Sequence, residues 1–300
     1  MLFDRNFVVG YVLPAAIFLG ISLVLLHGFG LLPHVFVLTE ADIPLFILIA
    51  GIASWIVGLC LFIVNVDIVG LMEGYGRFNP ARFFGRVQTQ RYRELNSAIS
   101  ELDKKYKECI SNGEKFPDEL QPKRSELMLK RAMQFPDQER WLLPTAFGNA
   151  IRAFEVYPRV MYGLESVQGW ARLLAVIPKE YREFVDTAKA RTDFWVNLWF
   201  LSLLTIVEYM GASFYTDEFK IPLVLGGAFV SSFIASRKAR KAAYQWGEWK
   251  KASVDVFLAE FRTKLGFLPP ATIEQEQDIW TAFSQAIIYR RPDSMKAVQK

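Results

Sequence analysis

The chain has 300 residues, of which 52% are hydrophobic and 15% aromatic, and its formal net charge is +4. A soluble domain is usually about 45–50% apolar with glycine included, so the excess favours a membrane protein. The basic residues gather beside hydrophobic runs and no nucleic-acid-binding motif is present, so we expect no nucleic-acid partner.

Two hydrophobic runs open the chain, at residues 7–29 and 43–69. Each exceeds the roughly 20 residues of helix that cross a bilayer. The first run has no charged residue and is longer than the roughly 7–15 residues of a signal peptide, which predicts an uncleaved span. Pro14 lies inside it, where a kink is tolerated if neighbouring groups bond the freed carbonyl. Three small residues share one face of the second run, on which another helix could pack closely: Gly51, Ser54 and Gly58.

Two further hydrophobic runs follow at residues 194–215 and 219–235. Asp193 opens the third run, and aromatic residues at both of its ends are typical of membrane interfaces. The fourth run is shorter and rich in small residues, which favours a helix that packs against other helices rather than lipid. The four runs therefore predict two transmembrane hairpins.

The basic residues that flank these runs predict the orientation. The connection at residues 30–42 has no lysine or arginine, and the one after the third run has only Lys220. Basic residues instead follow the second and fourth runs: Arg77, Arg82, Arg86, Arg237, Lys238, Arg240 and Lys241. Because cytoplasmic flanks carry most basic residues, we expect a multi-pass protein of a cell inner membrane with both termini cytoplasmic. We expect anionic lipid headgroups as partners, with Phe78, Phe83 and Phe84 inserted among them.

The segment between the hairpins has a helical pattern. A heptad-like apolar seam runs through residues 87–110: Tyr92, Leu95, Ile99, Leu102, Tyr106 and Cys109. A second helix, at about residues 118–134, is expected to fold back on the first as a hairpin. After the fourth run, a last helix is expected to begin at Thr272. Its predicted buried face comprises Ile279, Trp280, Phe283 and Ile287.

The predicted fold is all-α, with four transmembrane helices and a cytoplasmic helical domain. Neither the central nor the C-terminal segment could hide its apolar faces alone, so we expect the two to pack together. The predicted parts are a transmembrane hairpin at residues 1–72, a cytoplasmic segment at 73–193, a second hairpin at 194–235 and cytoplasmic helices at 236–300.

A polar stripe follows one helix of the central segment, predicted at residues 144–157. Pro144 suits its first turn, and Pro158 is expected to stop it. At 100° per residue the polar side chains fall on one face of this helix. With two tyrosines that follow, they form the candidate polar site: Thr145, Asn149, Arg152, Glu155, Tyr157 and Tyr162.

Two interpretations of this stripe are open. The plainer one is a core-packed helix whose Arg152 and Glu155 form an exposed i,i+3 ion pair, which contributes little to stability. The other is a binding site or a subunit contact, ringed by aromatic side chains that include Trp141 and Trp170.

Two acidic residues are expected inside or near the predicted spans. Glu208 would lie about two turns from the outer end of the third run, and Asp67 about one turn from the cytoplasmic end of the second. Such groups are costly in a membrane and often functional, so a channel or transporter would use Glu208 as a proton or cation site. In the plainer interpretation, Glu208 reaches the outer interface and Asp67 pairs with Arg5 or Arg237.

No catalytic or metal-binding pattern is present. His27 and His34 are both expected at the outer surface, and no nucleotide-binding glycine loop occurs. Cys60 is expected in a span and Cys109 in the reducing cytoplasm, so no disulfide is expected. We therefore expect no catalytic residue, no cofactor and no metal.

The stripe residues and a second motif carry a resemblance. The first set is Pro144-Thr145, Gly148-Asn149, Arg152-Ala153, Glu155, Tyr157 and Tyr162-Gly163, and the second is Leu265-Gly266, Pro270-Ala271-Thr272 and Trp280. Through these residues the sequence resembles a family of uncharacterised bacterial integral membrane proteins. The resemblance implies bacterial membrane placement and no mechanism.

The expected function is that of a non-enzymatic docking, regulatory or oligomerising membrane module. Its partner would be a second copy of the chain or a cytoplasmic protein. One alternative is a channel or transporter that uses Glu208 and Asp67. A second is a membrane enzyme whose polar site comprises Thr145, Asn149, Arg152 and Glu155.

Overall fold

The computed structural model describes residues 4–32, 43–77, 79–291 and 293–296, and every regular element within them is helical, as predicted. The chain divides into two compact units. Unit 1 comprises Met1–Met72 and Asp186–Ala243, and unit 2 comprises Glu73–Val185 and Tyr244–Lys300. Two long helices, α9 (Lys179–Thr216) and α10 (Pro222–Lys264), contribute to both units.

The first helix of unit 1 is continuous from Arg5 to Gly28, although its turns change in type. It comprises α1 (Arg5–Phe7), a π-helical stretch η1 (Val8–Val12) and α2 (Leu13–Gly28). Pro14 has no N–H to donate to the carbonyl of Gly10, four residues earlier. Asn197 Nδ2 of α9 donates to that carbonyl instead, at 2.8 Å. The freed carbonyl is therefore satisfied by a neighbouring helix, which explains why the proline is tolerated.

The second hydrophobic run does not form one helix. The helix α3 (Ile43–Ile63) ends before Val64, and α4 (Asn65–Glu73) begins after it. The apolar span therefore ends at Ile63 rather than at the predicted residue 69. Of the predicted small-residue face, Ser54 and Gly58 are buried. A Cβ on Gly58 would lie 3.2 Å from the backbone of Val12, so the glycine permits close approach of α3 to η1.

Three helices are long and apolar enough to cross a membrane, which supports membrane association: Arg5–Gly28, Ile43–Ile63 and Lys179–Thr216. The fourth predicted run forms the beginning of α10. Its apolar part ends before Arg237, and residues 222–235 extend only about 21 Å at 1.5 Å per residue, against a hydrocarbon core of about 30 Å. The apolar part of α10 is therefore too short to cross the membrane by itself. The predicted fourth span stays a proposal.

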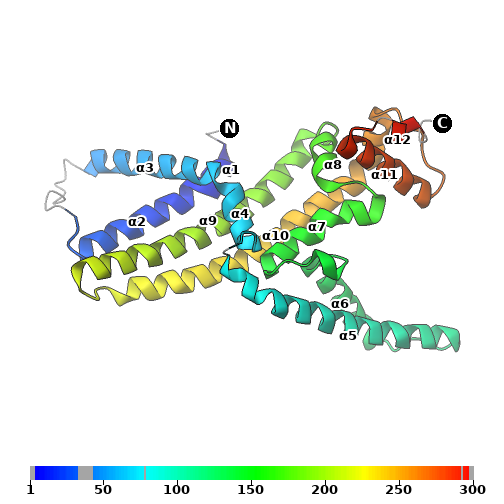
Figure 1. The fold of residues 1–300 in the computed structure, drawn as a ribbon, viewed down its shortest axis with the longest axis horizontal. Coiled ribbons are helices and arrows are strands. Elements are labelled where there is room, and N and C mark those ends of the chain that lie inside the picture. The colour runs from blue at the N-terminus through cyan, green and yellow to red at the C-terminus, as the bar shows by residue number, and fades with distance from the viewer. Residues whose placement is uncertain (1–3, 33–42, 78, 292, 297–300) are drawn as a thin grey trace. The chain divides into compact units, whose positions relative to one another are not determined.

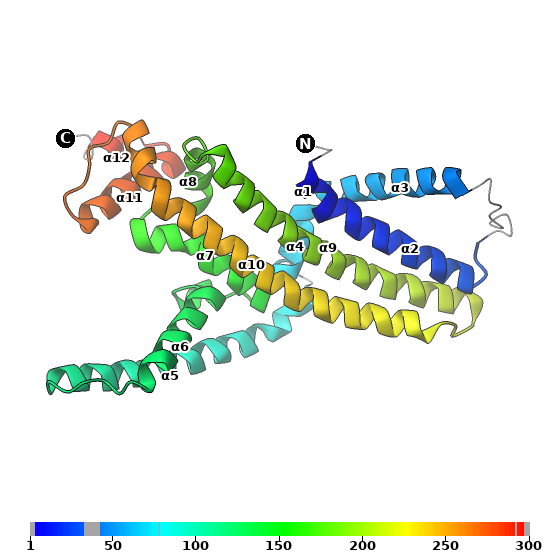
Figure 2. The same cartoon turned by 180° about the vertical axis from the view of Figure 1, so that it is seen from behind.

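Unit 1 packs its helices around a small apolar core. Figures 1 and 2 show α2, α9 and the first part of α10 side by side, with α3 beside α2. Near the ends of these helices, Leu25 and Phe29 pack against Tyr209 and Ala212. The predicted second hairpin, at residues 194–235, lies within unit 1.

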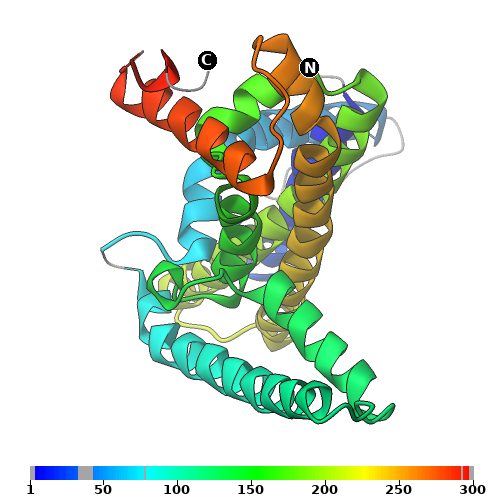
Figure 3. The same ribbon diagram turned by 90° about the vertical axis from the view of Figure 1, so that its right-hand side faces the viewer.

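Unit 2 carries a two-helix arm, which we define as residues 85–134. The arm pairs α5 (Gly85–Ser111) with α6 (Leu120–Gln134), as the seam predicts, and Figure 3 shows the two helices against each other. Four residues of the seam are buried: Tyr92, Leu95, Ile99 and Leu102. Phe135 completes a cluster with the first three of these.

The helix that carries the polar stripe is longer than predicted. It is α7 (Ala146–Tyr162), so Pro158 lies inside the helix and does not end it. Gly163 ends it, with φ +78° and its N–H donated to the carbonyl of Arg159. An interior proline costs about 3 kcal/mol, and the buried packing of α7 outweighs this cost.

The main core of unit 2 forms around Trp280, which is fully buried. It lies on α11 (Ile273–Tyr289), and its ring stacks on Phe261 at a centroid distance of 5.2 Å. Ile279 and Phe283 are buried with it and Ile287 is partly buried, which agrees with the predicted face. The remaining elements of the unit are the 3₁₀ turns η3 (Pro80–Phe84) and η4 (Glu139–Trp141) and the helices α8 (Ser166–Leu173) and α12 (Asp293–Lys296).

Candidate functional site

The first two residues of the polar stripe hold the start of α7 in place. Thr145 is the N-cap: its Oγ1 accepts from Gly148 N at 2.8 Å and donates to the carbonyl of Glu73 at 3.0 Å. Asn149 is fully buried, and its amide binds both backbone groups of Leu143, at 2.7 Å and 2.8 Å. These hydrogen bonds use the polar atoms that a ligand would need.

The next two residues of the stripe belong to a charged cluster with Glu73 and Tyr75. Arg152 donates to the Tyr75 hydroxyl, and its Nη1 lies 3.7 Å from a Glu155 oxygen. Glu73 is only 8% exposed. Gly148 permits this arrangement, because a Cβ there would lie 2.6 Å from the carbonyl oxygen of Glu73. The side chains of Arg152 and Glu155 are both half-buried. They do not form the exposed ion pair of the plainer interpretation.

Burial dominates the electrostatics of this cluster. It raises the pKa of Glu73 to about 7, with the nearby Glu155 charge adding to the rise and Arg152 opposing it. Burial also raises the pKa of Glu155, against the charges of Arg152 and Lys250. The cluster can therefore hold a proton on Glu73 near neutral pH.

Lys250 supplies the second cation of the cluster from α10. Its ammonium lies over three rings, at 4.6 Å from Trp170, 5.3 Å from Phe154 and 5.4 Å from Trp246. Ring faces attract a cation within about 6 Å, so these contacts hold the ammonium in place. Neither Lys250 nor Glu73 was among the predicted site residues.

The two tyrosines of the predicted site form a separate group. The hydroxyls of Tyr157 and Tyr162 both donate to Asp255 of α10, at 3.0 Å and 2.8 Å. Burial, followed by the hydrogen bond to Asp255, raises the pKa of Tyr162 to about 12 and that of Tyr157 still further. The six predicted residues thus divide into a cap, a charged cluster and a tyrosine–carboxylate group.

The two predicted membrane acids lie in different settings. Glu208 accepts a hydrogen bond from the Ser22 hydroxyl at 2.7 Å. Asp67 is exposed in the first turn of α4, where the helix dipole favours a carboxylate. Arg5 donates to Thr187 and Arg237 lies over the ring of Phe233, and neither pairs with Asp67 in the described part of the chain.

A polar group in unit 1 was missed by the sequence reasoning. Buried Asp193 accepts from Tyr11 at 2.8 Å, from Lys189 at 2.6 Å and from Asn65 at 3.4 Å. These bonds join η1, α4 and α9. Only the i,i+4 spacing of Lys189 and Asp193 was visible in the sequence.

The basic flanks and the histidines are placed as follows. The turn η3 exposes Phe83 and Phe84 at 86% and 60%, and Phe78 lies outside the described residues. All of the flanking basic residues except the half-buried Arg240 are exposed. His27 is exposed and His34 lies outside the described residues. In the described part of the chain no three His, Cys, Asp or Glu side chains gather to hold a metal, and both cysteines are free.

Comparisons of the chain with protein-family models, curated proteins and solved structures find no match.

Proposed function

We propose that the chain is a non-enzymatic inner-membrane protein whose cytoplasmic helices dock a protein partner. The observation that carries the proposal is the arm of unit 2. The arm buries one narrow seam of α5, and the other faces of that helix are exposed. A long exposed helix pair contributes little to the hydrophobic core of unit 2. We therefore infer that the function of the arm depends on its exposed surface.

The tip of the arm is held by its own contacts. Arg124 binds Asp103 at 2.6 Å and lies over the ring of Tyr106 at 4.3 Å. Tyr106 in turn packs edge-on against Phe116 at 5.2 Å. Fixing each of these side chains has an entropic cost, which is already met in the folded arm. Binding of a partner then requires less further ordering.

The membrane placement rests on the apolar helices and on the basic flanks. The three apolar helices support insertion, and the exposed Arg77, Arg82 and Arg86 beside Phe83 and Phe84 support a cytoplasmic, headgroup-facing position for this segment. The resemblance noted above supports a bacterial source.

The two alternatives have less support. An enzyme site built on Thr145 and Asn149 would need polar atoms that already bind the backbone. A transport pathway through Asp67 would need that residue inside a span, but it lies in α4, beyond the end of α3.

Site-specific photo-crosslinking in cells tests the docking proposal. A photoreactive residue at Ser100, on the exposed side of α5, should give one discrete adduct, whereas the exposed Lys264 of α10 serves as the matched control position. Deleting residues 104–123 and joining Asp103 to Arg124 by a short glycine-rich turn should remove the adduct. Because those two side chains already form an ion pair, the unfolding temperature should fall by only about 2–4 °C, or about 1 kcal/mol.

The outcome that contradicts the proposal has two forms. One is an absence of any adduct at Ser100. The other is the same adduct from the shortened arm, since the tip would then not contribute to binding.

A further inference from the structure

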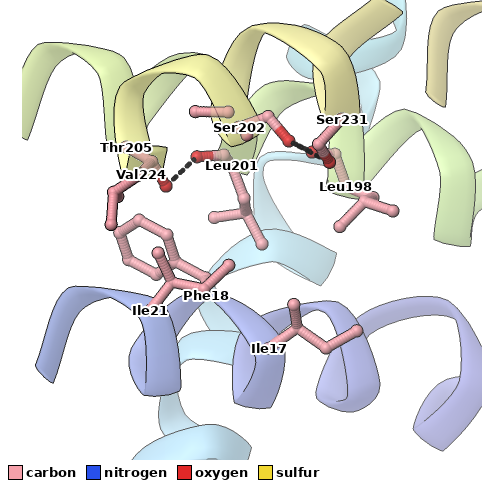
Figure 4. Close-up of a pocket in the computed structure, with 11 residues that line it drawn as sticks. Ile17, Phe18, Ile21, Leu198, Leu201, Ser202, Thr205, Val224 and Ser231 are labelled. Carbon is pink, nitrogen blue, oxygen red and sulfur yellow. Dashed lines mark hydrogen bonds between the residues drawn. The ribbon is translucent and has the colours of Figure 1, made fainter. Parts of the chain in front are cut away.

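Unit 1 contains a cavity of about 250 Å³ between α2, α9 and the beginning of α10. Its walls include Ile17, Phe18 and Ile21 of α2, Leu198 and Leu201 of α9, and Val224 of α10. In Figure 4 the side chains of the first three point toward α9, across the space between the helices. The cavity lies at the level of the apolar segments of the two spans Arg5–Gly28 and Lys179–Thr216.

The hydroxyl groups in the cavity wall are already bonded. Ser202 donates to the carbonyl of Leu198 at 2.7 Å and shares a second hydrogen bond with Ser231 at 2.9 Å. Thr205 donates to the carbonyl of Leu201 at 3.0 Å, and Figure 4 shows this bond beside the Ser202–Ser231 bond. With its hydroxyls already bonded, the wall offers a mainly apolar surface, which favours hydrocarbon over water.

A carboxylate lies about one helical turn beyond the residues that line the cavity. Glu208 follows Thr205 by three residues, or about 4.5 Å along α9. Its partner Ser22 follows the wall residue Ile21 directly, and their hydrogen bond of 2.7 Å bridges the same two helices as the cavity. Glu208 is half-buried and has no cationic partner among the described residues. In the next turns of the same helices, Leu25, Phe29 and Tyr209 form a buried cluster.

An apolar cavity with a carboxylate one turn beyond it, and no described cation beside that carboxylate, matches an amphiphile of opposite charge. We propose that this cavity binds the hydrocarbon chain of a single-chain cationic amphiphile, whose amine binds the Glu208 carboxylate. A neutral or anionic head group would leave the carboxylate without a counter-charge, which is costly inside a membrane. The proposal is independent of the docking function, because it concerns unit 1 alone.

Photolabelling of the full chain in lipid nanodiscs tests the proposal. The probe is a long-chain alkyl amine with a diazirine in the chain, and the matched alkyl alcohol is its control. We expect the amine to label the peptides around residues 17–21 and 198–205 roughly fivefold more than the alcohol does. Glu208→Gln should lower labelling by the amine to the level of the alcohol.

Two neighbouring glycines supply matched variants. Gly227 lines the cavity and Gly226 does not, and a Cβ on either one meets no atom within 4 Å. Gly227→Leu should therefore fill the cavity and abolish the labelling, whereas Gly226→Leu should retain it. Equal labelling by amine and alcohol in the unaltered chain would overturn the proposal, as would undiminished labelling of Gly227→Leu.

Discussion

Replacing Asn149 by leucine should lower the free energy of unfolding of unit 2 by about 2–4 kcal/mol, because two half-buried backbone groups of Leu143 lose their partners. The side-chain amide binds the N–H of Leu143 at 2.7 Å and its carbonyl at 2.8 Å. Each unsatisfied group costs about 1–3 kcal/mol, and leucine offers neither a donor nor an acceptor. Denaturant titration of the detergent-solubilised chain, followed by tryptophan fluorescence, measures the loss.

The matched control for Asn149 is Asn96 on the arm. Asn96 is half-buried and accepts a single side-chain hydrogen bond, from Arg131 at 3.1 Å. Asn96→Leu should therefore cost no more than about 1 kcal/mol. Equal decreases in the free energy of unfolding for the two variants would contradict the structural role of Asn149. Asn149 would then again be a candidate ligand-binding residue.

Replacing Glu73 by glutamine removes most of the pH dependence of stability between pH 5 and pH 8. An unfolded glutamate titrates near 4.5, whereas the Glu73 pKa is about 7 in the folded chain. Between these values the folded chain keeps a proton that the unfolded chain has released. The stability that Glu73 contributes is therefore greatest below about pH 4.5 and is lost as the pH rises through about 7, by roughly 3 kcal/mol in all.

The measurement is the free energy of unfolding at several pH values for both proteins. The glutamine variant should match the unaltered chain near pH 4 and exceed it by roughly 3 kcal/mol at pH 8. Glu126→Gln, on the exposed side of α6, is the control and should leave the slope unchanged. A slope that survives in Glu73→Gln would show that another group, such as Glu155, carries the titration.

The spacing of apolar residues predicted where helices occur better than it predicted the residues at which they begin and end. The apolar runs and the heptad seam predicted the helices and the α5–α6 pairing, because both depend on local spacing. The break at Val64 escaped prediction, since only Asn65 and Asp67 interrupt an apolar run that continues on both sides of it. Pro158 led to the wrong prediction that the helix ends at residue 157. The helix continues to Tyr162 because the packing of α7 outweighs the local effect of the proline.

The candidate site was predicted only as one face of a helix. Thr145 caps α7, and Asn149, Arg152 and Glu155 follow it at helical spacing, which the sequence shows directly. Their partner Glu73 lies 72 residues before Thr145, and no spacing rule connects the two positions. Tertiary contacts of this kind depend on how helices pack, which one sequence does not reveal.

The central claim is that unit 2, with its docking arm, lies at the cytoplasmic face of the membrane. The chain has two natural thiols for a test: Cys109 in α5 and Cys60 in α3, both free. The measurement is labelling of Cys60→Ser, whose remaining thiol is Cys109, by a membrane-impermeant maleimide. With unit 2 in the cytoplasm, Cys109 should be labelled in inverted inner-membrane vesicles and not in intact spheroplasts, whereas labelling in intact spheroplasts alone would contradict this placement.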